Sequence, residues 1–377
     1  MTPVPERKKR ILIAPLDWGL GHATRCIPVI REFTAAGADV IIGSNSAAMI
    51  LLRKEFPQLE WVELPAYNIR YRFPGSMFLS VTAALPGIIF TIIREHNRLQ
   101  QIIRTHKIDA VISDNRWGLW TKKVPSVFIT HQVMIKCPHL LKFLEPLLCF
   151  LHKQIINRFT FCWIPDLEGD GNLSGDLSHK YPVPRNAKFI GWISRFMGQD
   201  NENRENIYDL IVILSGPEPQ RTKMEKNILN QLKSFSGKVI FCRGLPAGDM
   251  ELPEWKGYCT VEFLDHLNSD EMALKILQSG IIIARSGYST LMDLAVLGKK
   301  AILIPTPGQP EQEYLAEYSG LNNRMFIVRE KNFLLHDAIT RAMKIHNEVG
   351  RIPVQRENSS KLKTTVQEFL NRIRPSW

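Results

Sequence analysis

The sequence has 377 residues, of which 45% are hydrophobic and 23% are charged. This length corresponds to about two domains, and the composition excludes a disordered, collagen-like or coiled-coil protein. The formal net charge is +11, and residues 1–200 hold 25 basic against 16 acidic residues. The basic excess of this half predicts an anionic partner, either a phosphorylated substrate or an anionic membrane surface. We find no signature of a nucleic-acid-binding module and expect no nucleic-acid partner.

The cysteines and the N-terminus indicate a cytoplasmic protein. The six cysteines are far apart, with no C-x-x-C pair and no metal-ligand spacing, so we expect reduced thiols and no metal site. Residues 1–10 are polar and basic, and the apolar run that follows is too short for a signal peptide.

Short apolar runs that end at turn residues alternate with helical patterns along the whole chain. The expected strands of the first half are Arg10–Pro15, Asp39–Gly43, Trp61–Leu64, Ala110–Ser113 and Ser126–Thr130. The expected strands of the second half are Leu210–Leu214, Lys238–Cys242, Thr260–Phe263, Gly280–Ala284, Ala301–Pro305 and Met325–Val328. The alternation predicts two α/β domains, each with a parallel sheet covered by helices on both faces.

We expect the domains to span residues 1–195 and 196–354, with the helix of 355–377 packing back on the first. Two further segments concern membranes. Residues 75–93 carry no charge, which fits a helix in a domain core, a membrane-touching surface segment or, least well, a spanning helix interrupted by Pro86-Gly87. Arg70, Arg72, Arg94 and Arg98 flank this run and would contact lipid headgroups. We interpret His139–Phe161 as an amphipathic core helix.

Two glycine turns follow expected strands. In Asp17-Trp-Gly-Leu-Gly-His22, Gly19 and Gly21 allow the backbone to approach a ligand, and His22 at a helix start is a candidate base. No third glycine and no carboxylate after the second strand complete a dinucleotide fingerprint, which argues against a nicotinamide enzyme. In Ile283–Leu294, the backbone of Ser286 and Gly287 can bind phosphate. Asp293 has two readings there: a capping box with Thr290, or a contact to ribose hydroxyls.

The third turn, Pro305–Tyr314, is rigid because it contains three prolines and one glycine. Gln309, Glu311, Gln312 and Glu313 crowd its exit. Their paired acceptors and donors suit sugar hydroxyls, although acidic residues are also common at an ordinary helix start. Asp114, after another expected strand, is a second candidate base or a turn residue.

Ala284–Ala316 resembles the C-terminal domain of glycosyltransferase family 28, which includes the peptidoglycan N-acetylglucosaminyltransferases. The Gly-x-Gly-His turn and Phe189–Arg195 are also similar to elements of that family. The resemblance implies a GT-B fold, in which two Rossmann-like domains face each other across a cleft, and a metal-independent hexosyltransferase with no cofactor beyond its nucleotide-sugar co-substrate. It implies that Ser286–Asp293 hold diphosphate and ribose, that Leu264 meets the base, and that Arg195 approaches the phosphates. The full set of expected nucleotide-sugar-binding residues is Gly19, Gly21, Arg195, Ser215, Gly216, Leu264, Arg285, Ser286, Gly287, Tyr288, Ser289, Thr290, Asp293, Gln309, Gln312 and Glu313.

The sequence departs from the family at three places. Asp293 stands where the peptidoglycan enzymes have Glu, and Glu313 replaces a Gln. The loop Leu214–Pro219 has prolines where the family has N–H donors to phosphate. These differences concern which donor is bound.

We therefore expect an inverting glycosyltransferase that moves a hexosyl or N-acetylhexosaminyl group from a nucleotide diphosphate sugar, a UDP-sugar above all. The acceptor would be a hydroxyl of a lipid, a glycan or a small molecule, with His22 as the first candidate base and Asp114 as the second. We expect a cytoplasmic enzyme, peripheral on the inner face of the plasma membrane if residues 75–93 touch lipid. Two alternatives stay open: a sugar-nucleotide hydrolase or epimerase on the same fold, and a non-catalytic binder of lipids or polyanions.

Overall fold

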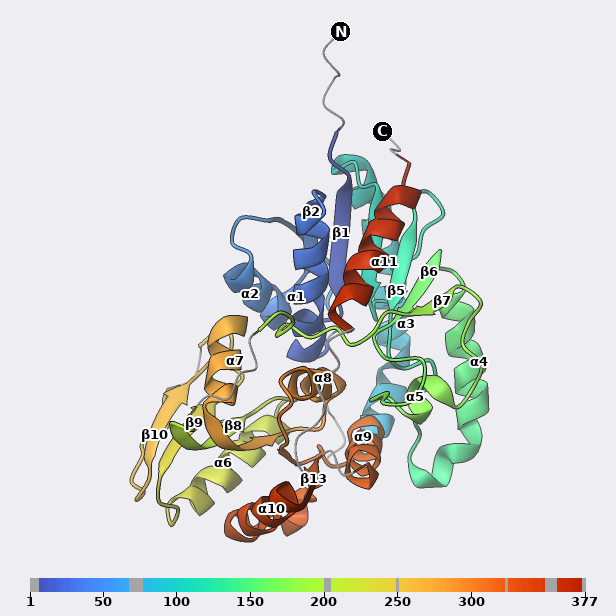
Figure 1. Cartoon of the computed structure of the whole chain (residues 1–377). Helices are drawn as coiled ribbons and strands as arrows, with labels where there is room; N and C mark the ends of the chain where they lie inside the picture. The colour runs from blue at the N-terminus through green and yellow to red at the C-terminus, as the bar shows by residue number, and fades with distance from the viewer. Residues whose placement is uncertain are drawn as a thin grey trace.

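The protein consists of two parallel sheets with helices on both faces, joined along one interface (Figure 1). The structure, a computed structural model, describes residues 7–67, 77–199, 205–248, 251–322, 325–349 and 358–374. Arg70, Arg72, the first two residues of the run 75–93, and most of the polar stretch between the expected domains lie outside the described residues.

The first sheet has the strand order β3-β2-β1-β4-β5-β6-β7, and every pairing in it is parallel. Its strands are β1 Arg10–Pro15, β2 Asp39–Ser44, β3 Glu60–Glu63, β4 Ala110–Asp114, β5 Ser126–Ile129, β6 Phe161–Ile164 and β7 Ala187–Phe189. The sequence predicted the first five. It missed β6, which begins at Phe161, the last residue of the segment interpreted as a helix, and β7, which has three residues with a lysine in the middle.

The helices of this domain are α1 Leu20–Ala35, α2 Ser46–Glu55, α3 Met77–Thr105, α4 Glu145–Ile156 and α5 Asp176–His179, with the 3-10 helix η1 His139–Leu144 before α4. Helix α1 follows β1 directly and packs against α2 and β1, so that its first turn stands at the carboxyl edge of the sheet.

The second sheet has the order β10-β9-β8-β11-β12-β13 and is also parallel. Its strands are β8 Tyr208–Ile213, β9 Lys238–Cys242, β10 Thr260–Leu264, β11 Ser279–Ala284, β12 Ile302–Leu303 and β13 Phe326–Ile327. Its helices are α6 Gln220–Leu232, α7 Ser269–Leu277, α8 Tyr288–Val296, α9 Pro310–Leu321 and α10 Leu335–Val349, with the 3-10 helix η2 Glu330–Asn332. All six predicted strands of this half are present. The two-sheet architecture confirms the predicted α/β fold class.

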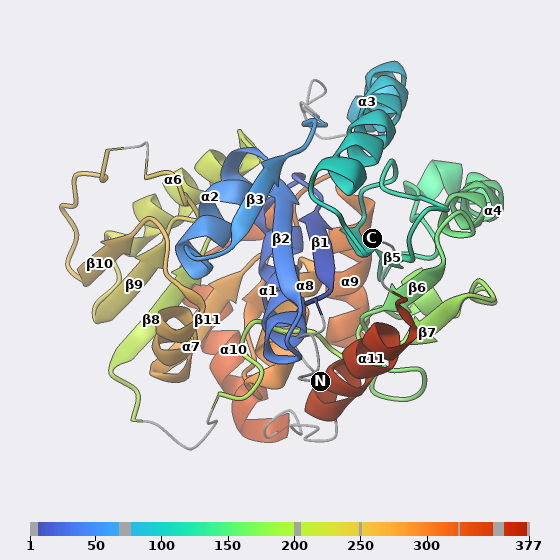
Figure 2. The ribbon, with the colours of Figure 1, turned by 90° about the horizontal axis from the view of Figure 1, so that it is seen from above.

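The two domains share a core. One cluster of buried apolar side chains runs from the first sheet through Ile193 and Phe196 into α8. The last helix, α11 Asn358–Arg372, crosses back onto the first domain, where Phe369 packs edge-on against Phe33 and Trp163. Figure 2 shows α11 beside β6 and β7, on the side opposite to α3.

The two long apolar segments of the first domain are less buried than helices packed in a domain core would be. The described part of the run 75–93, residues 77–93, belongs to α3, a single helix with Pro86 inside it, and Leu85, Ile89, Phe90 and Ile93 of that helix are exposed. The interpretation of 139–161 as a core helix is wrong, because Leu140 is 88% and Phe143 is 73% exposed and the segment ends in strand β6. Among the helices that the structure describes, none combines the length and apolar character needed to cross a bilayer.

Candidate active site between the domains

The three turns singled out in the sequence meet at the domain interface. Ser289, in the first turn of α8, donates a hydrogen bond of 2.7 Å to the carbonyl oxygen of Gly21, in the first turn of α1. Ser286, ahead of α8, donates to the carbonyl oxygen of Gln312 in α9 over 2.8 Å. The turn before α1, the turn before α8 and the turn before α9 therefore converge, as the sequence predicted.

The first of these turns places His22 at the start of a helix. Helix α1 begins at Leu20, and Gly19 before it has φ +86°, a left-handed backbone conformation that glycine adopts without strain. His22 keeps 18% of its side chain exposed. Among the described residues no group hydrogen-bonds to its Nε2 atom, so this nitrogen is available to a substrate.

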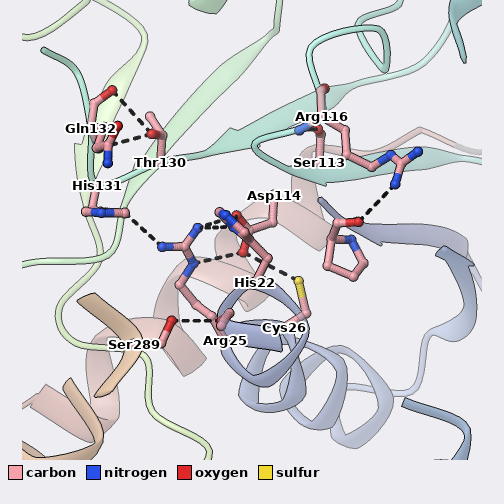
Figure 3. Close-up of polar contacts among 12 residues, drawn as sticks. His22, Arg25, Cys26, Ser113, Asp114, Arg116, Thr130, His131, Gln132 and Ser289 are labelled. Atoms are coloured by element: carbon pink, nitrogen blue, oxygen red, sulfur yellow. Dashed lines mark hydrogen bonds and ion pairs between the residues drawn. The ribbon is translucent and has the colours of Figure 1, made fainter. Parts of the chain in front are cut away.

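Asp114, the last residue of β4, is buried beside His22 (Figure 3). Its Oδ1 lies 3.0 Å from His22 Nδ1, and its Oδ2 accepts a hydrogen bond of 2.8 Å from Arg25 Nε. Burial alone would raise the pKa of Asp114, but the positive charge of Arg25 and the bonds to His22 hold that pKa well below its ordinary value. Asp114 is therefore a carboxylate with both oxygens engaged, and this geometry suits a group that orients His22 better than a second base.

His131 lies one strand further along the sheet, after β5, and completes the cluster. Its Nδ1 is 2.9 Å from Arg25 Nη1, and its Nε2 is 2.8 Å from Glu311 Oε1, at the start of α9 in the other domain. The His131 ring also stacks on the ring of Tyr288, with centroids 4.1 Å apart. The carboxyl ends of β1, β4 and β5 thus supply three polar side chains to one place, and the second domain covers them.

Helix α8 of the second domain begins at the turn that we predicted from the sequence to bind phosphate. Gly287 is the residue before its first turn, and no side chain caps the free N–H groups there, which leaves them available to an anion. The capping-box reading of Thr290 and Asp293 is wrong because Thr290 lies inside α8. Asp293 instead accepts hydrogen bonds from Ser194 over 2.6 Å and from Arg195 over 3.2 Å. Burial raises the pKa of Asp293 despite the neighbouring Arg195.

The third turn is braced by several of the side chains expected to contact the sugar. Gln312 Oε1 accepts from the Thr306 N–H over 3.0 Å, and Glu313 Oε1 accepts from the Gly308 N–H over 3.0 Å. Arg285 is fully buried beneath the turn, where it donates to the carbonyl oxygens of Ile304 and Pro305. These groups shape the turn, and their contact with a sugar stays a prediction.

Three polar atoms of this region are buried without a hydrogen-bond partner among the described residues: Arg285 Nε, Thr306 Oγ1 and Gln309 Oε1. Gly216, in the loop after β8, has φ +103° and approaches Thr306. The loop that holds Ser215 and Gly216 therefore stands beside the third turn. Leu264 was predicted to contact the nucleobase. Its carbonyl oxygen accepts a hydrogen bond of 2.8 Å from the Arg243 N–H.

The sequence reading missed the roles of Arg25, His131 and Ser194. Two signals could have found the first two. Arg25 lies three residues after His22, which places both on one face of a helix. His131 follows a buried strand as Asp114 does. In the part of the chain that the structure describes, no group of three or more His, Cys, Asp or Glu side chains is arranged to hold a metal ion.

Known glycosyltransferases are similar to this chain in sequence. Residues 253–372 match the model of the glycosyltransferase family 28 C-terminal domain. An uncharacterised glycosyltransferase of Methanosarcina acetivorans is 24% identical over 357 residues, which cover 86% of each chain. The UDP-N-acetylglucosamine–N-acetylmuramyl-(pentapeptide) pyrophosphoryl-undecaprenol N-acetylglucosamine transferase of Pasteurella multocida is 22% identical and covers 82% of this chain and 81% of its own.

Solved structures share the fold over nearly the whole chain. The glycosyltransferase of kitacinnamycin superposes with a TM-score of 0.59 at 13% identity, covering 96% of this chain and 95% of its own. MurG of Acinetobacter baumannii superposes with a TM-score of 0.54 at 12% identity, covering 97% and 99%. Residues 253–372 of this chain thus resemble the glycosyltransferase family 28 C-terminal domain, and the whole molecule has the two-domain GT-B fold of these solved glycosyltransferases.

Proposed function

We propose that this protein is an inverting glycosyltransferase in which His22 removes a proton from the acceptor hydroxyl. The observation that carries the proposal is the pairing of His22 with Asp114 at 3.0 Å. This pair lies opposite the uncapped start of α8 in the second domain, which we call the donor domain because we propose that it binds the nucleotide sugar; the first domain is then the acceptor domain. A base on one domain and an anion site on the other are what a transfer between two substrates requires.

In the proposed step, the acceptor oxygen attacks the anomeric carbon while its proton passes to His22 Nε2. The bond between that carbon and the diphosphate oxygen breaks on the opposite face, and the diphosphate leaves with the bonding electrons. Asp114 accepts the Nδ1–H of His22 and stabilises the imidazolium that forms. The N–H groups and dipole of α8 stabilise the negative charge that develops on the diphosphate.

Arg195 and Asp293 are the proposed link between the domains near the phosphates. Arg195 Nε is bonded to Asp293, and no described residue hydrogen-bonds to its two terminal nitrogens. These nitrogens would bind the diphosphate, and Asp293 would share its carboxylate with the ribose. We propose a UDP-sugar as the donor. The Pasteurella relative, whose name specifies UDP-N-acetylglucosamine, supports uracil as the nucleobase of the donor. A rhamnosyltransferase of the same fold binds thymidine diphosphate, so the nucleobase preference of this protein is part of the test below.

We further propose that the acceptor is lipid-linked and that the enzyme is peripheral on the cytoplasmic face of the membrane. Helices α3 and α4 lie on the same flank of the first domain (Figures 1 and 2). The exposed apolar side chains of α3, of α4 and of the 3-10 helix η1 that leads into α4 are Leu85, Ile89, Phe90, Ile93, Leu140, Phe143, Leu147, Phe150 and Leu151. We call this set the α3–α4 face.

The charges around the α3–α4 face are of one sign. Arg94, Lys142 and Arg158 are exposed, whereas Glu145, the one acidic residue of 139–160, is buried. An apolar surface bordered by cations is complementary to a bilayer that contains anionic lipid.

The test of the proposed function is product analysis with and without an acceptor. The donors are UDP-N-acetylglucosamine, UDP-glucose, GDP-mannose and dTDP-rhamnose, and the acceptor is a monosaccharide linked to a short prenyl diphosphate. We expect acceptor-dependent transfer with inversion at the anomeric carbon, read from proton NMR coupling constants. Retention of configuration would contradict the mechanism. Free sugar or an epimer, released at the same rate without acceptor, would establish the hydrolase or epimerase instead.

A further inference from the structure

Four polar side chains form a continuous path from the donor domain to the carboxylate that pairs with His22, the proposed catalytic base in the acceptor domain. Glu311 Oε1 is 2.8 Å from His131 Nε2, and His131 Nδ1 is 2.9 Å from Arg25 Nη1. Arg25 in turn holds Asp114 through Nε and Nη2. Only the first of these contacts crosses between the domains.

The donor and acceptor roles in this path set the tautomer of His131. A guanidinium has only donors, so His131 Nδ1 must accept from Arg25. The proton of the neutral ring therefore sits on Nε2, where it is donated to the carboxylate of Glu311. Burial lowers the pKa of His131 even though Glu311 opposes this effect, which agrees with a neutral ring.

The second domain holds the His131 ring in a second way. The ring lies parallel to the ring of Tyr288, with an interplanar angle of 3°. Tyr288 is the first residue of α8, and its hydroxyl donates to the carbonyl oxygen of Pro165 over 2.7 Å. The second domain therefore holds the orientation of the His131 ring through Tyr288, and through Glu311 it stabilises the tautomer that accepts from Arg25.

The state of His131 matters because Arg25 and Asp114 compete for His22 Nδ1. Arg25 Nη2 lies 2.9 Å from that nitrogen, and Asp114 Oδ1 lies 3.0 Å from it. If Arg25 donates to Nδ1, the ring proton moves to Nε2 and His22 cannot act as a base. If Nδ1–H donates to Asp114, Nε2 is free. An Arg25 anchored through Nη1 to His131 keeps Nε and Nη2 along the carboxylate.

We propose that Glu311 is a positioning residue for the base, acting through His131 and Arg25, so that His22 is competent only when the donor domain is docked. The inference rests on the proposed role of His22. It assigns to the start of α9 a function in proton transfer rather than in sugar binding.

The test compares Glu311→Ala in two backgrounds. In the wild type we expect kcat to fall by about 10- to 100-fold, the scale of a misplaced catalytic group, with the donor KM changed less than about 3-fold. In His131→Asn, the amide oxygen can accept from Arg25 without a fixed tautomer. There, Glu311→Ala should change kcat less than about 3-fold. Glu317→Ala, an exposed acidic residue of the same helix, is the matched control and should behave as wild type.

A readout without turnover separates this inference from the proposed function. In protein with ¹⁵N-labelled histidine, the wild-type His131 should show a protonated Nε2 and an unprotonated Nδ1, and Glu311→Ala should shift the ring toward the other tautomer. An unchanged tautomer, an equal kcat loss in His131→Asn, or a change in donor KM alone would overturn the role of Glu311. Full turnover of His22→Ala would overturn the role of His22 instead, whatever the spectrum shows.

Discussion

We propose different chemical roles for His22 and Asp114 although their side chains are in contact. His22 is partly exposed and its Nε2 has no hydrogen-bond partner among the described residues, whereas Asp114 is buried and paired with Arg25. The contrast follows from their positions. His22 stands in the first turn of a helix at the rim of the site, and Asp114 is the last residue of a central strand.

Replacing His22 with Ala should slow transfer by ~10²–10⁴ because the acceptor proton then has no base. The affinity for UDP should stay at the wild-type value because the donor site belongs to the other domain. Turnover assays and calorimetric titration with UDP check the two expectations. His106→Ala, which removes a histidine paired with Glu60 at the opposite end of the sheet, is the control. Wild-type turnover of His22→Ala would exclude this histidine from the mechanism.

Helix α4 differs between its two faces. Its exposed side contributes to the α3–α4 face, and its inner side buries His152 against Phe128. Burial lowers the pKa of His152 to about 4, against about 6.5 for an unfolded chain. The folded state therefore keeps this ring neutral at a pH where the unfolded state binds a proton.

The sign of the resulting pH effect is fixed. Above about pH 6.5 both states are neutral at His152, and its contribution is fully present. As the pH falls from about 6.5 toward 4, protonation of the unfolded state removes up to about 3 kcal/mol of stability. His152→Leu should abolish this part of the acid sensitivity. Urea unfolding at pH 7.5 and pH 4.5 checks it, and an equal loss of stability in wild type and variant would contradict it.

The α3–α4 face predicts binding to vesicles that contain phosphatidylglycerol. Phe90→Asp on α3 and Phe143→Asp on η1 should each weaken co-sedimentation by about tenfold or more, because each removes the burial of an aromatic ring in the bilayer. Added salt should weaken the binding of the wild type. Leu321→Asp, which alters an exposed apolar residue of the second domain, is the control. Equal binding of all variants would leave the face without a role at membranes.

At the scale of the whole molecule, the two domains are joined by hydrogen bonds as well as by the shared core. Glu55 accepts from the Ser269 hydroxyl over 2.8 Å, and Tyr318 donates to Asn172 over 2.9 Å. Helix α11 adds apolar contacts on the first domain after the chain has completed the second. These contacts predict that the domains unfold together.

A saturating nucleotide should therefore stabilise both domains. At a concentration of 100 times Kd, UDP should add about 2.7 kcal/mol to the free energy of unfolding. In calorimetry we expect a single transition that moves to higher temperature with UDP. Two transitions, of which only one moves, would show that the domains unfold independently.

How far the sequence predicts this protein differs from one level to the next. Local patterns were sufficient for eleven strands and the three turns that follow strands, because strand periodicity and turn residues are properties of neighbours in the chain. They were insufficient for strands β6 and β7. They also did not predict the exposure of α4, because an amphipathic pattern does not say whether its apolar side packs against protein or faces solvent.

The amino-acid sequence by itself determined two α/β domains and the residue types available at the ends of their strands. Only the tertiary structure decided that Asp114 orients His22, that Asp293 pairs with Ser194 and Arg195, and that Glu311 reaches His131. These contacts join positions 92, 99, 98 and 180 residues apart. A contact at such a separation depends on the packing of two sheets, and no local sequence pattern records it.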